Sequence, residues 1–185
     1  MRSKSRKQHS ADNFAMDVKA IRSKARQHLN AGAVTQGYAA DREVVLRLLN
    51  DALATELVCV LRYKRHQFMA SGIHAEPVAA EFAAHAGEEQ QHADRIAGRI
   101  IQLGGAPDFS PDGLAQRSHS EYVEGTDLRD MITENLVAER IAIDSYREMV
   151  TYLGDRDPTT RRMIEEILAV EGEHAHDMSD LLEKE

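Results

Sequence analysis

Two copies of the pattern Glu-x-x-His, Glu89 to His92 and Glu171 to His174, lie within long stretches of helical periodicity. Residues three positions apart on an α-helix share a face, so each copy presents a carboxylate and an imidazole in the same direction. Two other helical stretches carry single glutamates, Glu56 and Glu139, between apolar residues. These six side chains suffice to hold two metal ions between four helices.

Apolar residues recur at helical spacing over four long stretches, at about residues 41–70, 76–103, 126–153 and 158–185. Asp41 is a suitable N-cap for the first helix, and Pro77 suits the first turn of the second. Gly104 and Gly154 follow the second and third helices, where glycine commonly ends a helix. Since no pattern typical of β-strands competes, the sequence predicts an all-α fold.

The lengths of the connections predict the topology. Short connections join the first helix to the second and the third to the fourth, so each pair should form an antiparallel hairpin. The connection over residues 104–125 is long and contains Pro107, Pro111 and several glycines. About twenty extended residues reach roughly 66–72 Å, whereas a helix of about 28 residues is roughly 42 Å long. The sequence therefore predicts a four-helix bundle with one long crossover, in which the third helix runs parallel to the second.

The four glutamates at core positions favour a metal centre over ordinary surface charges. A buried, unpaired carboxylate costs several kcal/mol, and four of them in one core would be prohibitive. Two divalent cations would balance the four carboxylates, and neutral His92 and His174 would complete the ligand set. A single glutamate at helical spacing is usually solvated, but all six residues fall at a similar depth in the four helices. Mixed carboxylate and imidazole ligation suits iron, manganese or zinc.

Several residues near these ligands have more than one interpretation. Tyr63 lies seven residues after Glu56 on the same helix face, so it could hydrogen-bond a ligand, donate one electron, or simply pack in the core. We expect Glu88 and Glu173 to be solvated because they are rotated away from the apolar face. His85 precedes Glu89 by one turn, and we expect a core histidine there rather than one that supports a ligand.

The sequence also indicates a compartment. Cys59 is the single cysteine, so no intramolecular disulfide forms, and a reducing environment is expected. No apolar run approaches the roughly 20 residues of a membrane span. The basic N-terminus lacks the apolar segment of a secretory signal. We therefore predict a cytoplasmic protein without a membrane partner.

Residues 1–40 are expected to form a basic extension to the bundle of residues 41–185. Residues 1–30 contain eight Lys/Arg and two Asp, a net charge of +6, and the total of −8 leaves −14 for the remainder. Residues 1–13 are polar and predicted to be disordered, and residues 14–29 suit a short amphipathic helix that docks on the bundle or on a neighbouring subunit. The basic residues 1–26 could contact DNA phosphates, or they could serve only solubility or docking.

Around these ligands, residues 41–185 resemble bacterioferritins and Dps-like members of the ferritin superfamily. The similar segments are Glu56 to Val58 with Tyr63, Glu88 to Arg95, Asn135 to Glu139, and Glu165 to Leu168 leading to Glu171 and His174. The resemblance implies that Glu56 and His92 hold one iron ion, that Glu139 and His174 hold the other, and that Glu89 and Glu171 bridge them.

The resemblance further implies a ferroxidase that uses O2 or H2O2 to oxidise Fe(II) and stores Fe(III) in a hollow homo-oligomeric shell. Bacterioferritins carry a haem-ligand Met directly after the second-helix glutamate, but this chain has Gln90 there, so no haem is expected at that position. Only eleven residues follow His174, so we expect no fifth helix. Because that helix packs at the four-fold axes of 24-subunit shells, a dodecamer is favoured over a 24-mer.

Two alternatives remain open. One is a di-metal peroxidase or catalase-like protein related to rubrerythrin or manganese catalase, although no Cys-x-x-Cys module is present. The other is a Dps-like DNA-protecting protein, because the N-terminal extension resembles the DNA-binding tails of some Dps proteins. Dps proteins place their iron site between subunits, whereas all six ligands here lie in one chain. The ligand set does not decide between iron and other metals, or between O2 and peroxide.

Overall fold

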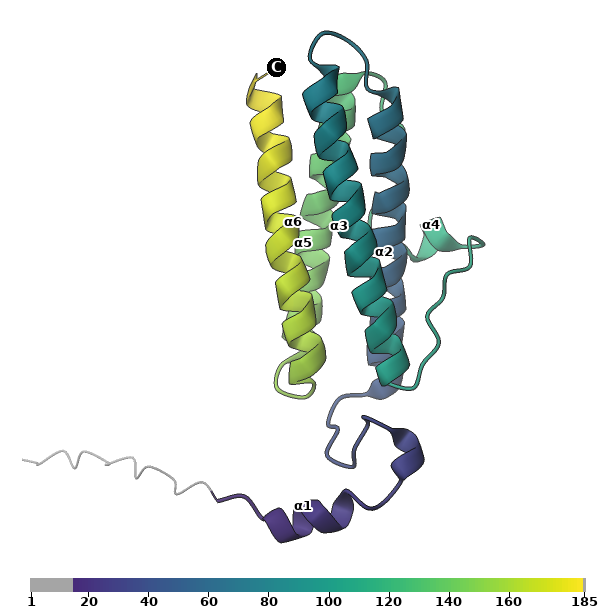
Figure 1. Ribbon diagram of the computed structural model, residues 1–185, viewed down its shortest axis with the longest axis vertical. Coiled ribbons are helices and arrows are strands. Elements are labelled where there is room, and N and C mark those ends of the chain that lie inside the picture. Colours follow the sequence, from purple (N-terminus) through teal and green to yellow (C-terminus); the bar gives the residue numbers. More distant parts are fainter. Residues whose placement is uncertain (1–14, 185) are drawn as a thin grey trace, which may run out of the picture.

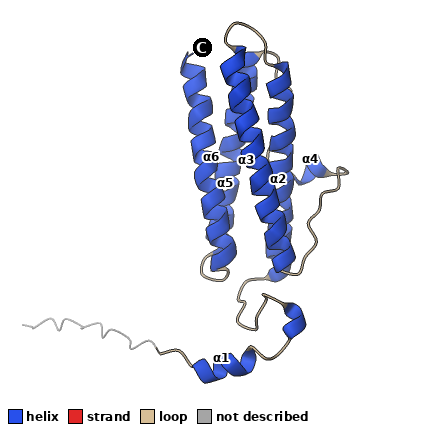
Figure 2. Ribbon diagram, in the orientation of Figure 1, coloured by secondary structure: helices blue, strands red, loops and turns tan. Residues whose placement is uncertain are grey.

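Four long helices form the body of the protein. The structure, a computed structural model, describes residues 15–184. The helices are α2 (Arg42–Met69), α3 (Ala75–Gln102), α5 (Leu128–Leu153) and α6 (Pro158–Lys184), and they pack side by side in a bundle (Figure 1). The described residues contain helices and turns but no strand (Figure 2). The predicted all-α four-helix bundle is confirmed, and α6 is the last helix of the described chain.

The helix ends follow from local hydrogen bonding. Asp41 caps α2, since its Oδ1 accepts hydrogen bonds from the backbone N–H groups of Glu43 and Val44 at 3.1 and 3.2 Å. Asp127 caps α5 in the same way through the N–H of Asp130, at 2.9 Å. Gly154 ends α5 with a φ of 48°, a left-handed value that costs glycine little. The predicted helix boundaries agree with these ends to within two residues.

The crossover between α3 and α5 runs along α2. Two crossover residues contact α2 at points two turns apart: His119 N donates to Thr55 Oγ1 at 2.9 Å, and Arg62 Nη1 donates to the Glu121 carbonyl at 3.1 Å. The crossover therefore returns to the other end of the bundle, and α5 runs parallel to α3 as predicted (Figure 1). It also contains the four-residue helix α4 (Leu114–Arg117), which is too short to produce a periodic signal in the sequence.

The hydrophobic core is divided into two clusters. The larger one is built mainly of aliphatic residues, which include Val45, Leu49, Leu53, Ile96, Ile100, Leu153, Ile164 and Ile167. The smaller one lies at the other end of the bundle and contains Tyr63, Val78, Phe82, Met131, Ile132 and Met178. Along each long helix, the predicted glutamates and histidines fall between the residues of the two clusters. Since each large buried side chain contributes roughly 1.5–3 kcal/mol, the two clusters can hold a polar layer between them.

The N-terminal extension lies beyond one end of the bundle (Figure 1). It contains α1 (Val18–Lys24) and a single 3-10 turn, η1 (Leu29–Ala31). The predicted helix over residues 14–29 is thus too long: α1 ends early, and His28 adopts a left-handed φ of 52° that interrupts the helix. No residue of α1 is buried, so it does not dock on this bundle as one prediction proposed. The disorder predicted for residues 1–13 lies outside the described residues.

Among residues 15–184, no helix is both long enough and apolar enough to cross a membrane.

Candidate metal centre

All six predicted ligands converge in the polar layer. Each is at most 4% exposed, and together they form two groups whose ligand atoms lie within 4.8 Å of one another. The two groups share Glu89 and Glu171; the first adds Glu56 and His92, and the second adds Glu139 and His174. Each group offers three carboxylates and one imidazole, a donor set that suits first-row transition metals. The two shared carboxylates would lie between the ions if both groups were occupied.

Both imidazoles direct Nδ1 into the centre. His92 Nδ1 lies 3.1 Å from Glu171 Oε1, 3.4 Å from Glu89 Oε2 and 3.5 Å from Glu56 Oε2. His174 Nδ1 lies 3.4 Å from both Glu89 Oε1 and Glu171 Oε2. Two ligand atoms each about 2.1 Å from one ion and at right angles are roughly 3 Å apart. The observed separations are therefore close to those that a shared ion requires.

Buried atoms without hydrogen-bond partners concentrate in this layer. Ten such side-chain nitrogen and oxygen atoms occur among the described residues, and seven belong to the predicted ligands. They include both oxygens of Glu89 and of Glu171, and Nδ1 of both histidines. Folded proteins rarely leave buried polar atoms unpaired. Divalent cations would satisfy all seven atoms, so the residues present fit a dinuclear metal centre.

The electrostatics of the layer favour protons where metal ions would otherwise bind. Burial, and then the charges of Glu89 and Glu171, raise the pKa of Glu56 and of Glu139 well above the usual value. Burial opposes a charge on His92, but its contacts with Glu171, Glu56 and Glu89 outweigh that effect and raise its pKa to about 12. The pKa of His174 rises to about 11 for similar reasons. Metal ions must therefore displace protons.

Two tyrosines hold the two unshared glutamates. Tyr63 donates a hydrogen bond to Glu139 Oε1 at 2.6 Å, which agrees with the first of its three interpretations. Tyr146 donates to Glu56 Oε1 from the opposite direction. Tyr146 was not predicted to contact the centre, although it follows Glu139 by the same seven residues that separate Glu56 from Tyr63. That repeated spacing is the sequence signal that could have identified it.

Glu88 is solvated as predicted, but it also contacts one of the predicted ligands. Its side chain is 49% exposed, yet Oε2 lies 2.6 Å from His174 Nε2. When His174 Nε2 donates its hydrogen to this carboxylate, the Nδ1 lone pair is left facing the centre. The contact comes from another helix, so periodicity within α3 did not reveal it. Glu173 is exposed as predicted.

A family model described as the ferritin-like domain matches residues 46–185. The chain belongs to the ferritin-like domain family. The predicted resemblance to the ferritin superfamily is thereby confirmed.

Two curated relatives of this ferritin-like chain illustrate its similarity. It is 30% identical over 140 residues to a bacterioferritin of Mycobacterium avium, which covers 75% of this chain and 84% of the relative. It is 31% identical over 144 residues to a nutrient stress-induced DNA-binding protein of Nostoc sp., which covers 74% of this chain and 76% of the relative.

Solved structures give the same fold. A dodecameric thioferritin from Bacteroides fragilis, described as bacterioferritin-related, superposes with a TM-score of 0.76 at 32% identity, covering 79% of this chain and 88% of the other. Dps from Thermosynechococcus elongatus superposes with a TM-score of 0.73 at 20% identity, covering 76% and 90%. The second similarity concerns the fold alone.

A buried arginine side chain, Arg62, lies beside the predicted metal ligands, and the sequence analysis did not predict it. Arg62 is fully buried, and its Nε donates to Asn135 Oδ1 at 2.9 Å. Asn135 Nδ2 is in turn 3.0 Å from His66 Nδ1, which ties α2 to α5. The Arg62 charge lies close enough to favour the ionised form of Glu139. Cys59 is buried as expected, 3.4 Å from Arg62 Nη2, and burial raises the pKa of its thiol.

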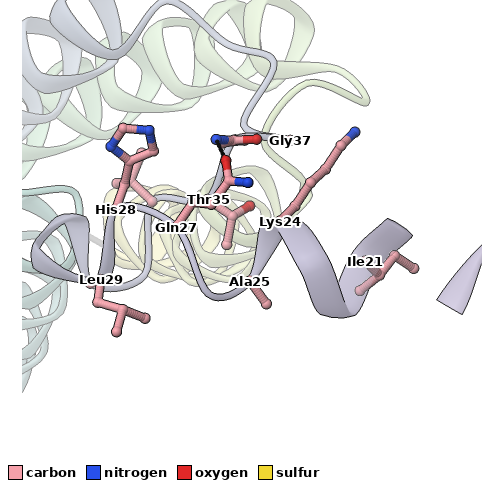
Figure 3. Close-up of a pocket in the computed structure, with 11 residues that line it drawn as sticks. Ile21, Lys24, Ala25, Gln27, His28, Leu29, Thr35 and Gly37 are labelled. Carbon is pink, nitrogen blue, oxygen red and sulfur yellow. Dashed lines mark hydrogen bonds between the residues drawn. The ribbon is translucent and has the colours of Figure 1, made fainter. Parts of the chain in front are cut away.

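A hollow in the N-terminal extension is separate from the metal centre. It has a volume of about 310 Å³ and lies between α1 and the loop around Leu29 and Thr35 (Figure 3). The described residues that line it include Lys24 and His28 but no Asp, Glu or Cys. Without carboxylates it does not suit the hard cations that the bundle core would hold.

Proposed function

We propose that the protein is a ferroxidase that oxidises Fe(II) at the centre in its bundle and passes Fe(III) to a mineral store. The observation that carries the proposal is the pair of buried four-ligand groups that share Glu89 and Glu171, whose oxygens have no hydrogen-bond partner. The bacterioferritin of Mycobacterium avium supports it as a named relative. We expect the protein in the cytoplasm, where a thiol such as that of Cys59 stays reduced.

In this proposal each ligand has a distinct role. Glu56 and His92 bind one Fe(II), Glu139 and His174 bind the second, and Glu89 and Glu171 bridge the pair. The four carboxylates balance two Fe(II) ions, so the loaded centre is neutral. Each Fe(II) gives up one electron, and the pair reduces O2 with two protons to H2O2, or H2O2 with two protons to two waters. Oxidation leaves two uncompensated positive charges, which favours release of Fe(III) toward the store.

The two tyrosines are positioning residues for this chemistry. Tyr63 and Tyr146 each donate to a terminal carboxylate, which orients the oxygen left free for the ion. Burial, and next the charge of Glu139, raise the pKa of Tyr63 well above its usual value, so the phenol keeps its proton. If Tyr63 donates an electron, its proton passes to Glu139, which is 2.6 Å away.

Stopped-flow absorbance tests the ferroxidase proposal. Fe(II) is mixed with metal-free protein in the presence of O2 or of H2O2, for the wild type, Glu89→Ala and the exposed control Glu173→Gln. We expect rapid oxidation that saturates near about two Fe(II) per chain in the wild type and the control, and none in Glu89→Ala. A wild-type rate equal to that of the buffer would refute the proposal and turn attention to manganese or zinc.

A di-metal peroxidase or catalase-like activity uses the same ligands and is the main alternative. Carboxylate and imidazole ligands also accept manganese and zinc. The two functions differ in the fate of the product, since only a storage protein retains ferric mineral. Iron that co-elutes with the protein after repeated additions of Fe(II) supports storage, whereas peroxide turnover without retained iron supports the alternative.

We propose that the chain assembles into a dodecamer, in keeping with the dodecameric thioferritin of Bacteroides fragilis. Several large apolar side chains on the surface of the bundle would be covered in such an assembly: Leu61, Phe68, Met69, Ile73, Ile101 and Val137. Native mass spectrometry tests the subunit number. Twelve chains are expected, and a mass of 24 chains or of one chain contradicts the proposal.

We propose DNA binding as a second function. It would belong to the N-terminal extension, residues 1–40, whereas the bundle of residues 41–185 would hold the metal centre. Lys19, Arg22, Lys24 and Arg26 are exposed on the described part of this extension, and the relative from Nostoc sp. is named a DNA-binding protein. Residues 1–14 of the proposed contact region 1–26 lie outside the described residues. We expect a gel shift at low salt that weakens steeply as salt is raised and that deletion of residues 1–26 abolishes. No shift by the full-length protein contradicts the proposal.

No haem is proposed for this centre. Gln90 replaces the methionine ligand, and its Nε2 donates to Asp94 Oδ1 at 3.0 Å on the exposed face of α3. A visible spectrum of the purified protein after haem addition should therefore lack the band of a haem that is bound through methionine sulfur.

A further inference from the structure

A second cluster of ligand-type side chains lies beside the dinuclear centre. Glu81 and His85 come from α3, and Asp177 comes from α6. His85 Nε2 lies 3.2 Å from Glu81 Oε1 and 3.6 Å from Asp177 Oδ2, and one ligand atom of each residue lies within 4.8 Å of the others. The His85 side chain is only 3% exposed, whereas those of Glu81 and Asp177 are 40% and 46% exposed. The imidazole thus lies at the base of a cluster whose carboxylates reach solvent.

The hydrogen bonds of His85 decide which of its nitrogens is free. Tyr63 gives its one hydroxyl hydrogen to Glu139, so toward His85 Nδ1, 3.1 Å away, it can only accept. His85 must then carry its hydrogen on Nδ1, which leaves the lone pair of the neutral ring on Nε2. That lone pair faces the two carboxylate oxygens. A cation among these three atoms would satisfy the lone pair of the neutral ring and both carboxylates at once.

We propose that Glu81, His85 and Asp177 bind a third divalent cation. Two carboxylates balance its charge, and the mixed oxygen and nitrogen donors suit Fe(II), Mn(II) or Zn(II). Three protein ligands on a half-exposed surface leave coordination positions for water, which is typical of a site that exchanges its ion rather than of a closed structural site.

The cluster is connected to the half of the dinuclear centre that contains His174. The rings of His85 and His174 stack with centroids 3.9 Å apart. The Tyr63 hydroxyl connects His85 to Glu139 by hydrogen bonds. One ligand atom each of His85, Glu88 and His174 also lie within 4.8 Å of one another. Ligand-type side chains therefore continue from the surface to the buried centre. We assign the third site to collecting Fe(II) from solvent for that centre; this role rests on the proposed ferroxidase function, whereas the binding of the ion does not.

Equilibrium dialysis against Co(II), followed by elemental analysis, tests the binding of the ion. The test variant is Glu81→Gln with Asp177→Asn, which removes the two carboxylates with almost no change in shape. The control is Glu76→Gln with Glu173→Gln, which makes the same change in charge at exposed positions of the same two helices. We expect about three Co(II) per chain in the wild type and the control and about two in the test variant.

Anomalous diffraction from Co(II)-treated crystals of the wild type locates the ion. A peak among His85 Nε2, Glu81 and Asp177, together with two peaks in the buried centre, supports the third site. Two buried peaks without the third overturn this proposal and leave the proposed ferroxidase function intact. Equal Co(II) binding by the wild type and the test variant also overturns it.

The delivery role has its own measurement. At Fe(II) concentrations below saturation, the initial oxidation rate of the test variant should fall several-fold, while the number of Fe(II) oxidised by the buried centre stays that of the control. Equal initial rates in the test variant and the control would overturn the delivery role.

Discussion

Glu88 shows how one partly exposed side chain can govern a buried ligand. Its carboxylate is half in solvent, yet it binds His174 Nε2 and thereby orients Nδ1 toward Glu89 and Glu171. Without this contact the His174 ring could rotate or take the other tautomer, and either change removes the lone pair from the centre. The binding of one ion therefore depends on a residue that does not itself belong to the two buried groups.

Replacing Glu88 should weaken metal binding selectively. For Glu88→Ala we expect the affinity for one of the two buried ions to fall roughly 10- to 100-fold, the usual effect of losing such a supporting contact. Glu88→Gln should cost less because its amide oxygen still accepts the Nε2 hydrogen. Anaerobic Co(II) titration measures both ions, with Glu173→Ala as the exposed control. Unchanged affinity in Glu88→Ala would contradict the orienting role.

Proton release should accompany metal binding. The pKa values of His92 and His174 rise to about 12 and 11, so at neutral pH both imidazoles hold protons in the metal-free protein, and the raised pKa values of Glu56 and Glu139 shift those carboxyls toward their protonated forms. A divalent ion must displace these protons, so its apparent affinity should increase as pH rises from 6 toward 9. Calorimetric titration in two buffers with different ionisation enthalpies measures the protons released; identical heats in both buffers would rule this out.

At the scale of the elements, Asp157 joins three segments at one end of the bundle. Its Oδ1 accepts from the backbone N–H of Thr160 at 3.0 Å in the first turn of α6. Its Oδ2 accepts from the Tyr38 hydroxyl of the extension at 2.9 Å, and Arg99 Nη2 of α3 lies 3.0 Å from Oδ1. The residue is 2% exposed, so its charge depends on these partners.

Asp157→Ala should destabilise the fold. Removing one partner of a buried charge pair costs roughly 3–5 kcal/mol of unfolding free energy, whereas Asp155→Ala, which breaks only an exposed pair with Arg161, should cost under about 1 kcal/mol.

Burial alone would raise the pKa of Asp157, but its hydrogen bonds with Thr160 and Tyr38 and the Arg99 charge lower it below 3.8. A depressed carboxyl pKa stabilises the fold above the unfolded-state value, so this stabilisation should be lost only as pH falls below about 3.8. Urea unfolding of both variants at pH 7 and pH 3 measures each effect; equal losses at pH 7 would exclude the proposed role.

The sequence predicted what lies along one helix better than what lies between helices. Spacing within a helix identified Glu56, Glu89, Glu139 and Glu171, because residues on one face are set by the helical period alone. The contact of Glu88 with His174 depends on how α3 and α6 are rotated about their axes, and periodicity does not contain that rotation. The same limit applies to the cluster around His85, which combines off-face residues of two helices.

At the scale of the whole molecule, the polar layer divides the core into two apolar clusters. In the metal-free protein this layer brings four glutamates and two histidines into the interior, where charge is costly. Metal ions that bind only the folded state stabilise it by mass action, by about 2.7 kcal/mol at a free concentration 100 times the Kd. We therefore expect metal binding and folding to be coupled through this layer.

Metal removal should lower the thermal stability of the assembly. We expect the Tm of metal-free protein to be several degrees below that of protein loaded with Co(II), and the difference should vanish in Glu89→Ala. Differential scanning calorimetry of both proteins, with and without Co(II), measures it. A Tm of the wild type that is independent of Co(II) would contradict the coupling.

The reciprocal tyrosine contacts reveal an internal pseudo-two-fold axis. Tyr63 on α2 donates a hydrogen bond to Glu139 on α5, and Tyr146 on α5 donates one to Glu56 on α2. A half-turn that exchanges the two helical hairpins would therefore exchange these two contacts. The symmetry does not extend to the side chains that contact His174. Glu88 and His85 on α3 correspond to Val170 and Ile167 on α6, counted back from Glu89 and Glu171 respectively.

Corresponding positions that are polar on one side are apolar on the other, and Ile167 is fully buried. The two halves of the centre are thus related by symmetry in their ligands but not in their surroundings. An ion bound at His174 would have a ligand that Glu88 orients, whereas no described contact from outside the ligand set orients His92, so a near-duplicate pair of hairpins should yield two metal sites of unequal affinity.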